Sequence, residues 1–155
     1  KKIFFFFFQL KYAYFETNYI AKLSKLSSDA IDYFPNQPSA YFYNSVAAAW
    51  NKDFAAAVEM ANEGLIVAGG NEIHTAKLQV GLALGLAGKN DFVAAKTAID
   101  KAMAISKEKY AFAYEAAGDL ALAQGNATEA QNSWQKSKDM GNLNRSLIQK
   151  LQVPK

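Results

Sequence analysis

A motif that recurs three times is the feature that most limits how this chain can fold. The last copy is Tyr114-x-x-Ala117-Gly118-x-x-Ala121, then Gly125, then Ala130-x-x-x-Trp134. The earlier copies are Tyr43-x-x-Val46-Ala47-x-x-Trp50 with Ala57-x-x-x-Ala61, and Lys77-x-x-Val80-Gly81-x-x-Leu84 with Gly88 and Ala95-x-x-x-Ile99. The anchoring alanines of successive copies are 38 and 35 residues apart. A period of this length predicts a stack of helical hairpins.

The composition agrees with a helical, globular chain. The 155 residues are enough for one domain with a sizeable core, and 51% are hydrophobic while 20% are charged. The net charge is only +3, the lysines are dispersed and Arg145 is the one arginine, so nucleic acid is not expected as a partner. The absence of cysteine excludes a disulfide framework, a thiolate zinc site and a cysteine nucleophile.

Regular breaks divide the chain into short helical segments. Pro35-Asn36-Gln37-Pro38, Gly69-Gly70-Asn71, Gly88-Lys89-Asn90-Asp91, Gly125-Asn126 and Gly141-Asn142 are typical turn or helix-end sequences. Asn126 with Glu129 three residues later is typical of a capping box. Between the breaks the apolar residues have helical spacing. We therefore predict helices over 3–17, 20–33, 39–51, 54–68, 72–87, 91–105, 109–124 and 127–139, with a terminal helix at 143–152.

Small residues in the motif are expected where two helices approach closely. We predict contacts of Gly118 with Ala130, Gly81 with Ala95, and Ala47 with Ala57. The series Gly81-x-x-x-Gly85-x-x-Gly88 has the same explanation, because no strand precedes it and no Gly-Lys-Ser/Thr follows.

These residues resemble the tetratricopeptide repeat, a helix–turn–helix unit of 34 residues, over about residues 20–141. The resemblance implies an all-α, right-handed α-solenoid of about 3.5 repeats in one domain, 1–155, with a capping helix at 142–152. The repeats would cover 3–35, 38–69, 72–106 and 109–141. The stretch from Tyr114 to Leu151 and the segment Phe34–Tyr43 are also similar to tetratricopeptide proteins of bacteria of the Bacteroidetes type. That similarity leaves a cytoplasmic and a periplasmic or envelope location open.

The two ends of the chain differ. Leu143, Leu147 and Leu151 at four-residue spacing predict an amphipathic cap, with the polar residues Asn144, Arg145, Gln149 and Lys150 on its other face. Lys1-Lys2 with Ile3–Leu10 is too short to span a bilayer and is either a helix or the remnant of a targeting segment. The run Phe4–Phe8 predicts either a helix that is buried on all sides or a stretch that is not natural. We expect it to pack against something before Lys1 or to mediate self-association.

No catalytic constellation is evident. His74 is the only histidine, and it has no second histidine or cysteine nearby, so a surface role is favoured over metal binding. No serine has a histidine and aspartate set, and the carboxylates have the spacing of solvated helix faces. Asn126-Ala127-Thr128 and Asn144-Arg145-Ser146 match the glycosylation pattern, which short tripeptides often do by chance. We expect no enzyme activity, no cofactor and no metal.

A binding surface is the remaining expectation. In the family, the first helix of each hairpin lines a concave groove for a peptide or a partner helix. Here the resemblance places on that face Tyr41, Asn44, Ser45, Asn51, Leu78, Gln79, Phe112, Glu115 and Asp119. A basic clamp for a terminal carboxylate is not evident, since Asn44, Gln79 and Glu115 occupy its positions. The expected function is a non-catalytic scaffold or adaptor. The alternatives are a chaperone-like module that shields an apolar client segment and an accessory domain of a larger protein.

Overall fold

The computed structural model describes the backbone of residues 2–152 and the side chains of residues 9–152. Within these residues the chain is all-α, with nine helices and short connections. The helices are α1 (Lys2–Glu16), α2 (Ile20–Tyr33), α3 (Pro38–Trp50), α4 (Phe54–Ala68), α5 (Glu72–Gly88), α6 (Phe92–Ile105), α7 (Ala111–Ala123), α8 (Ala127–Asp139) and α9 (Arg145–Leu151). The side chains of the run Phe4–Phe8, and with them its expected burial, lie outside the described residues.

The predicted helices are confirmed, with small shifts at their ends. The largest shifts are at α7, which starts at Ala111, and at α9, which covers only Arg145–Leu151. The late start of α7 follows from the preceding turn, where Lys107 and Glu108 both have positive φ angles of 51° and 60°. None of the described helices is long and apolar enough to cross a membrane.

Most of the central helices begin at a residue whose side chain caps the helix N-terminus. Asp53, Asn71 and Asp91 each accept a hydrogen bond from the backbone N–H three residues later, as N-caps do. The predicted capping box at Asn126 is present in half, because Asn126 caps the helix but its own backbone N–H donates to the Ala121 carbonyl. Asn126 Oδ1 accepts from the Glu129 N–H at 3.1 Å, and its Nδ2 donates to the Glu129 carboxylate at 2.7 Å.

The turn after α5 corrects one prediction. Gly88 was expected just past the helix end, but it is the last residue of α5, and Asn90 takes the left-handed conformation with φ 64°. A Cβ on Gly88 would overlap the ring of Phe54 in α4. Gly88 is therefore required by close packing between helices, as the glycine series predicts, and not by the turn.

The glycines of α5 pack against the preceding hairpin. A Cβ on Gly81 would overlap Ser45 Oγ and would lie 4.0 Å from Ala61 Cβ, so the residues that require a glycine here are in α3 and α4 and do not include the predicted Ala95. Gly85 faces Ala57 and Val58 in the same way. By contrast, Gly118 lies against Ala130 and Trp134, as the motif predicts.

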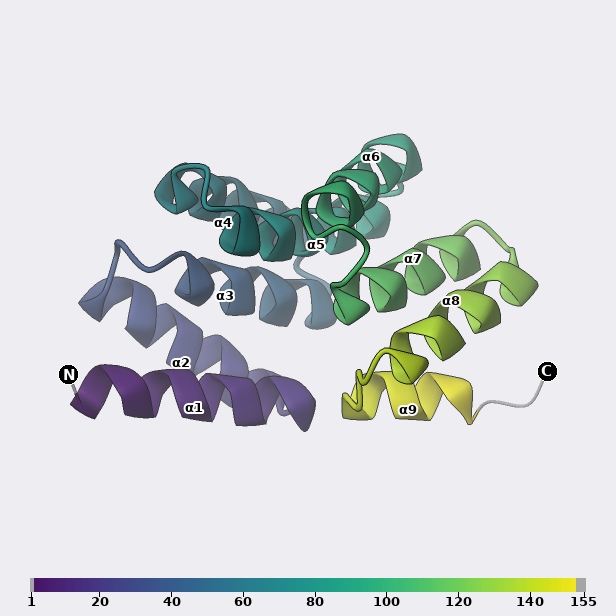
Figure 1. Ribbon diagram of the computed structural model, residues 1–155. Coiled ribbons are helices and arrows are strands. Elements are labelled where there is room, and N and C mark those ends of the chain that lie inside the picture. The colour runs from purple at the N-terminus through teal and green to yellow at the C-terminus, as the bar shows by residue number, and fades with distance from the viewer. Residues whose placement is uncertain (1, 153–155) are drawn as a thin grey trace.

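Most contacts join helices that are neighbours in sequence. In addition, α3 packs on α5 and α5 on α7, so these three form an inner row, with α4 and α6 on its outer side and α8 between α7 and α9 (Figure 1). The row curves until the end of α1 lies beside the start of α9 (Figure 1). There Asn144 Nδ2 donates to the Phe15 carbonyl at 3.0 Å, across 129 residues of sequence. The structure is thus a curved helical array whose two ends meet.

Candidate binding groove

The predicted binding residues of α3 and α5 lie mostly between helices. Tyr41 and Ser45 are buried, and the Tyr41 hydroxyl donates to the Pro35 carbonyl at 2.9 Å. The half-buried Asn44 donates its amide to Ser27 Oγ in α2 at 3.1 Å. Three further residues complete the set: Leu78 is fully buried, Gln79 is half-buried and Asn51 is exposed beyond the end of α3. These side chains do not form one open face.

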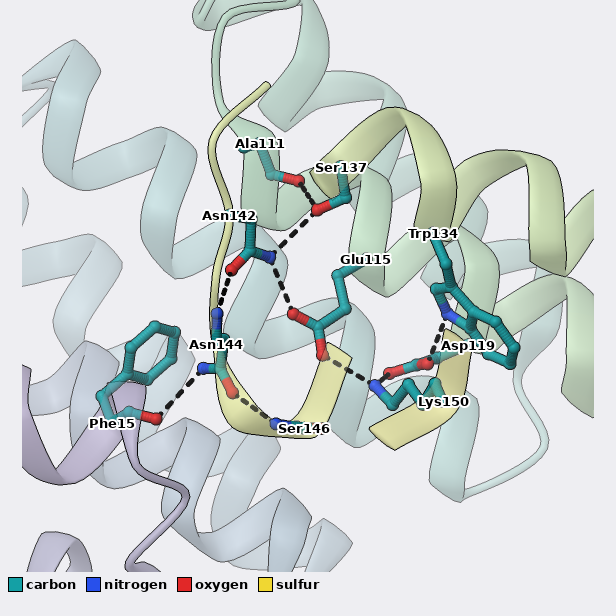
Figure 2. Close-up of polar contacts among 10 residues, drawn as sticks. All are labelled: Phe15, Ala111, Glu115, Asp119, Trp134, Ser137, Asn142, Asn144, Ser146 and Lys150. Atoms are coloured by element: carbon teal, nitrogen blue, oxygen red, sulfur yellow. Dashed lines mark hydrogen bonds and ion pairs between the residues drawn. The ribbon is translucent and has the colours of Figure 1, made fainter. Parts of the chain in front are cut away.

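The predicted residues of α7 are on the inner side of the array, but two of them bind the chain itself. Glu115 is only 1% exposed. Its carboxylate accepts from Asn142 Nδ2 at 2.9 Å and from Lys150 Nζ at 2.8 Å (Figure 2). Asp119 accepts from Trp134 Nε1 at 3.0 Å and from Lys150 at 2.7 Å. Both carboxylates therefore hold α9 and the turn before it.

The terminal helix agrees only in part with the predicted amphipathic cap. Leu147 is fully buried and Leu151 packs against the same apolar cluster, as predicted. Asn144 is fully buried and Lys150 points inward, whereas Leu143, expected on the apolar face, is 67% exposed. Burial raises the pKa of Asp119, and the attraction of Lys150 offsets part of that rise. Burial alone would lower the pKa of Lys150, but Asp119 and Glu115 raise it above its ordinary value. The polar residues of the cap are thus part of its attachment.

A cavity of about 190 Å³ opens on the inner side of the array. We call it the inner cavity. Phe112 is the one predicted binding residue among its lining. The lining comes from α1, α3, α5, the start of α7 and the turn before α9, and consists of Tyr12, Phe15, Glu16, Phe42, Tyr43, Lys77, Tyr110, Ala111, Phe112, Met140, Gly141 and Asn142.

A second cavity of about 340 Å³ adjoins it, and we call it the side cavity. It lies where the first turn of α5 meets the turn between α6 and α7, and is lined by Glu72, Ile73, Ala76, Lys77, Ile105, Ser106, Lys107, Lys109 and Tyr110. Lys77 and Tyr110 line both cavities, so the two form one depression. We refer to the two cavities together as the inner groove.

Burial dominates the electrostatics of the inner groove. It raises the pKa of Tyr43 to about 12 and that of Tyr110 well above its ordinary value, with nearby Glu16 contributing to both. Burial also raises the pKa of Glu16 and lowers that of Lys77. Both tyrosines stay protonated at neutral pH and offer a donor and an acceptor. Among the described residues, no carboxylate lies within ion-pair distance of Lys77.

Sequence reasoning did not select Lys77 or Tyr110. Lys77 was assigned to the motif position that is Tyr43 and Tyr114 in the other copies, where a large packing residue is expected. A lysine among aromatic residues at one repeated position is the signal that could have identified it. Tyr110 precedes its helix, and no periodic pattern marks it.

The described residues contain no group of three or more His, Cys, Asp or Glu side chains placed to hold a metal ion. The inner groove offers aromatic surface, tyrosine hydroxyls, the ammonium groups of Lys77, Lys107 and Lys109, and the carboxylates of Glu16 and Glu72. These groups can make apolar and polar contacts with a ligand. No known family model matches the chain. No curated protein matches it either.

Proposed function

We propose that this chain is a protein-interaction module of the tetratricopeptide type, a non-catalytic scaffold or adaptor that binds a partner segment in the inner groove. The observation that carries the proposal is the groove itself, with Tyr43, Tyr110 and Lys77 converging from three elements of the inner side. Rigid aromatic side chains supply contact area at low entropic cost, and tyrosine hydroxyls can bond a peptide backbone. The recurring motif and the successive helical hairpins support the assignment to this type.

Charge reversal at the groove tests the proposal. The intact chain and its Lys77→Glu variant serve as baits in extracts of the source cells, and bound chains are identified by mass spectrometry. Lys101→Glu makes the same change at an exposed position of the outer helix α6 and is the matched control. We expect Lys77→Glu to lose a partner that Lys101→Glu retains, with unchanged circular dichroism in both. Equal capture by all three chains would place the binding site elsewhere.

A chaperone-like function is supported by a different feature. A cavity of about 220 Å³ between α3, α5 and α7 is lined largely by apolar and small side chains, among them Trp50, Leu84, Ala87 and Ala116. Such a surface would accept an apolar helix at short distance. In that case the partner is retained by Lys77→Glu and lost by Ala87→Lys.

A further inference from the structure

The last turn of α1 occupies the inner side of the array. Phe15 is 7% exposed, and aromatic rings surround it. Its ring stacks on Trp50 with centroids 5.4 Å apart, meets Phe112 edge-on at 4.9 Å and lies 5.7 Å from Tyr43. One turn earlier, the ammonium of Lys11 lies 5.8 Å from the centre of the Tyr43 ring. Lys11 and Phe15 thus share one face of α1 and together cover Tyr43.

The same turn is held by its backbone. The carbonyl of Phe15 is at the end of α1, where it accepts from the Asn18 backbone N–H at 3.2 Å in the turn that follows. It also accepts from Nδ2 of the buried Asn144, whose Oδ1 in turn accepts from the Ser146 N–H at 2.8 Å (Figure 2). Asn144 is therefore held in place as a hydrogen-bond donor to the backbone of the last turn of α1.

Apart from these contacts, α1 is attached mainly to α2. The two helices are joined by three residues, of which Asn18 has a positive φ of 55°. A non-glycine residue in this conformation stores a modest strain that a changed turn would release. The contact has the features of a bound ligand, namely one aromatic side chain in an aromatic site and one backbone hydrogen bond.

We propose that the last turn of α1, which forms part of the wall of the inner cavity, is displaceable and that a partner helix takes its place. The partner is a helical segment that carries a basic residue and, four positions later, an aromatic residue in its last turn. That aromatic side chain takes the place of Phe15, and its main-chain carbonyl takes the hydrogen bond of Asn144. This inference rests on the proposed function and adds the ligand class and a built-in competitor.

A labelled peptide copying residues 9–19 tests the proposal against the full-length chain by fluorescence anisotropy. In the Phe15→Ala variant the internal competitor is weakened, so the peptide is expected to bind at least tenfold more tightly than to the wild-type chain. Adding Asn144→Ala to that variant should weaken binding about fivefold, as the loss of one hydrogen bond predicts. A peptide with alanine at the position of Phe15 is the control and should bind neither chain.

Equal affinity of both peptides, or no gain in the Phe15→Ala variant, overturns the inference. If that variant does not fold by circular dichroism, Phe15→Leu gives the same comparison with a smaller expected gain. If light scattering shows a dimer of the wild-type chain that the peptide dissociates, the occupant is α1 of a second copy, and an external partner is excluded. The two proposals can fail separately. If Lys77→Glu loses a partner that the wild-type chain and Phe15→Ala bind equally well, the proposed function stands and this inference is wrong.

Discussion

At the scale of single residues, the glycines of α5 show what a repeated motif does and does not reveal. The spacing predicts correctly that small residues mark a close helix contact, because only small side chains allow it. The spacing does not reveal which neighbour is contacted. Gly81 and Gly85 face α3 and α4, because α5 packs on the hairpin before it as closely as on α6.

Gly85→Ala tests this packing by the sign of its effect. At a solvent-exposed position of a helix, the change from glycine to alanine would raise the free energy of unfolding by about 1 kcal/mol, because alanine favours the helix more than glycine does. Here the added Cβ lies 2.8 Å from Val58 Cγ2 and 3.0 Å from the Val58 backbone nitrogen, which cannot move away easily. We expect a loss of about 1–3 kcal/mol in urea unfolding. Val93→Ala, at an 81% exposed position of α6, should change the free energy by less than about 0.5 kcal/mol. Stabilisation by Gly85→Ala would contradict the described contact.

Lys11 is expected to make the free energy of unfolding depend on pH. Burial lowers its pKa from 10.5 to about 8. Between these values the unfolded chain binds more protons than the native one, so the free energy of unfolding rises with pH. The raised pKa values of Tyr43 and Tyr110 act in the opposite direction only above about pH 10.

We therefore expect the free energy of unfolding to gain about 1–2 kcal/mol between pH 7.5 and 9.5. Urea unfolding at several pH values measures it. Lys11→Met should flatten the profile and leave the smaller slope of Lys77. Parallel profiles of the two chains would show that Lys11 is not desolvated.

At the scale of helices, the sequence predicts more about their extent than about their orientation. Caps, glycines and prolines are local signals, and they place the helix ends to within about two residues for most helices, since each acts through its own backbone. Orientation depends on partners distant in sequence. The apolar spacing placed Leu147 and Leu151 of α9 correctly, but Leu143 precedes the helix and is exposed. The inward position of Lys150 was not predicted, because its partners Glu115 and Asp119 are more than thirty residues away.

The attachment of α9 is open to a double-mutant cycle. Lys150→Met leaves the Glu115 carboxylate buried with only the Asn142 amide as its partner. We expect a loss of about 2–4 kcal/mol, somewhat below the usual cost of breaking a buried pair because Lys150 is 23% exposed. Combining it with Glu115→Gln should recover part of the loss, since the uncompensated charge is then gone. If the two changes are simply additive, the ion pair does not hold α9.

At the scale of the whole molecule, the closure of the array limits which surfaces of the inner side can contact a partner. The sequence favours a row of hairpins and a concave face, but the positions predicted to line it are largely used by α2, α4 and α9. The meeting of Phe15 with Asn144 could not be predicted, because it depends on the summed rotations of all the hairpins between them. Two hollows remain on the inner side: the inner groove, with Tyr110 and Lys77 lining both of its cavities, and the apolar cavity between α3, α5 and α7.

Site-specific photo-crosslinking in the source cells tests the central claim, that the inner groove is the binding surface, most directly. A benzoyl-phenylalanine replaces Tyr110 in one chain and Val93, on the outer helix α6, in another. The account predicts a covalent adduct of discrete mass from position 110 and none from position 93. Adducts from position 93 alone, or from neither position, would contradict it.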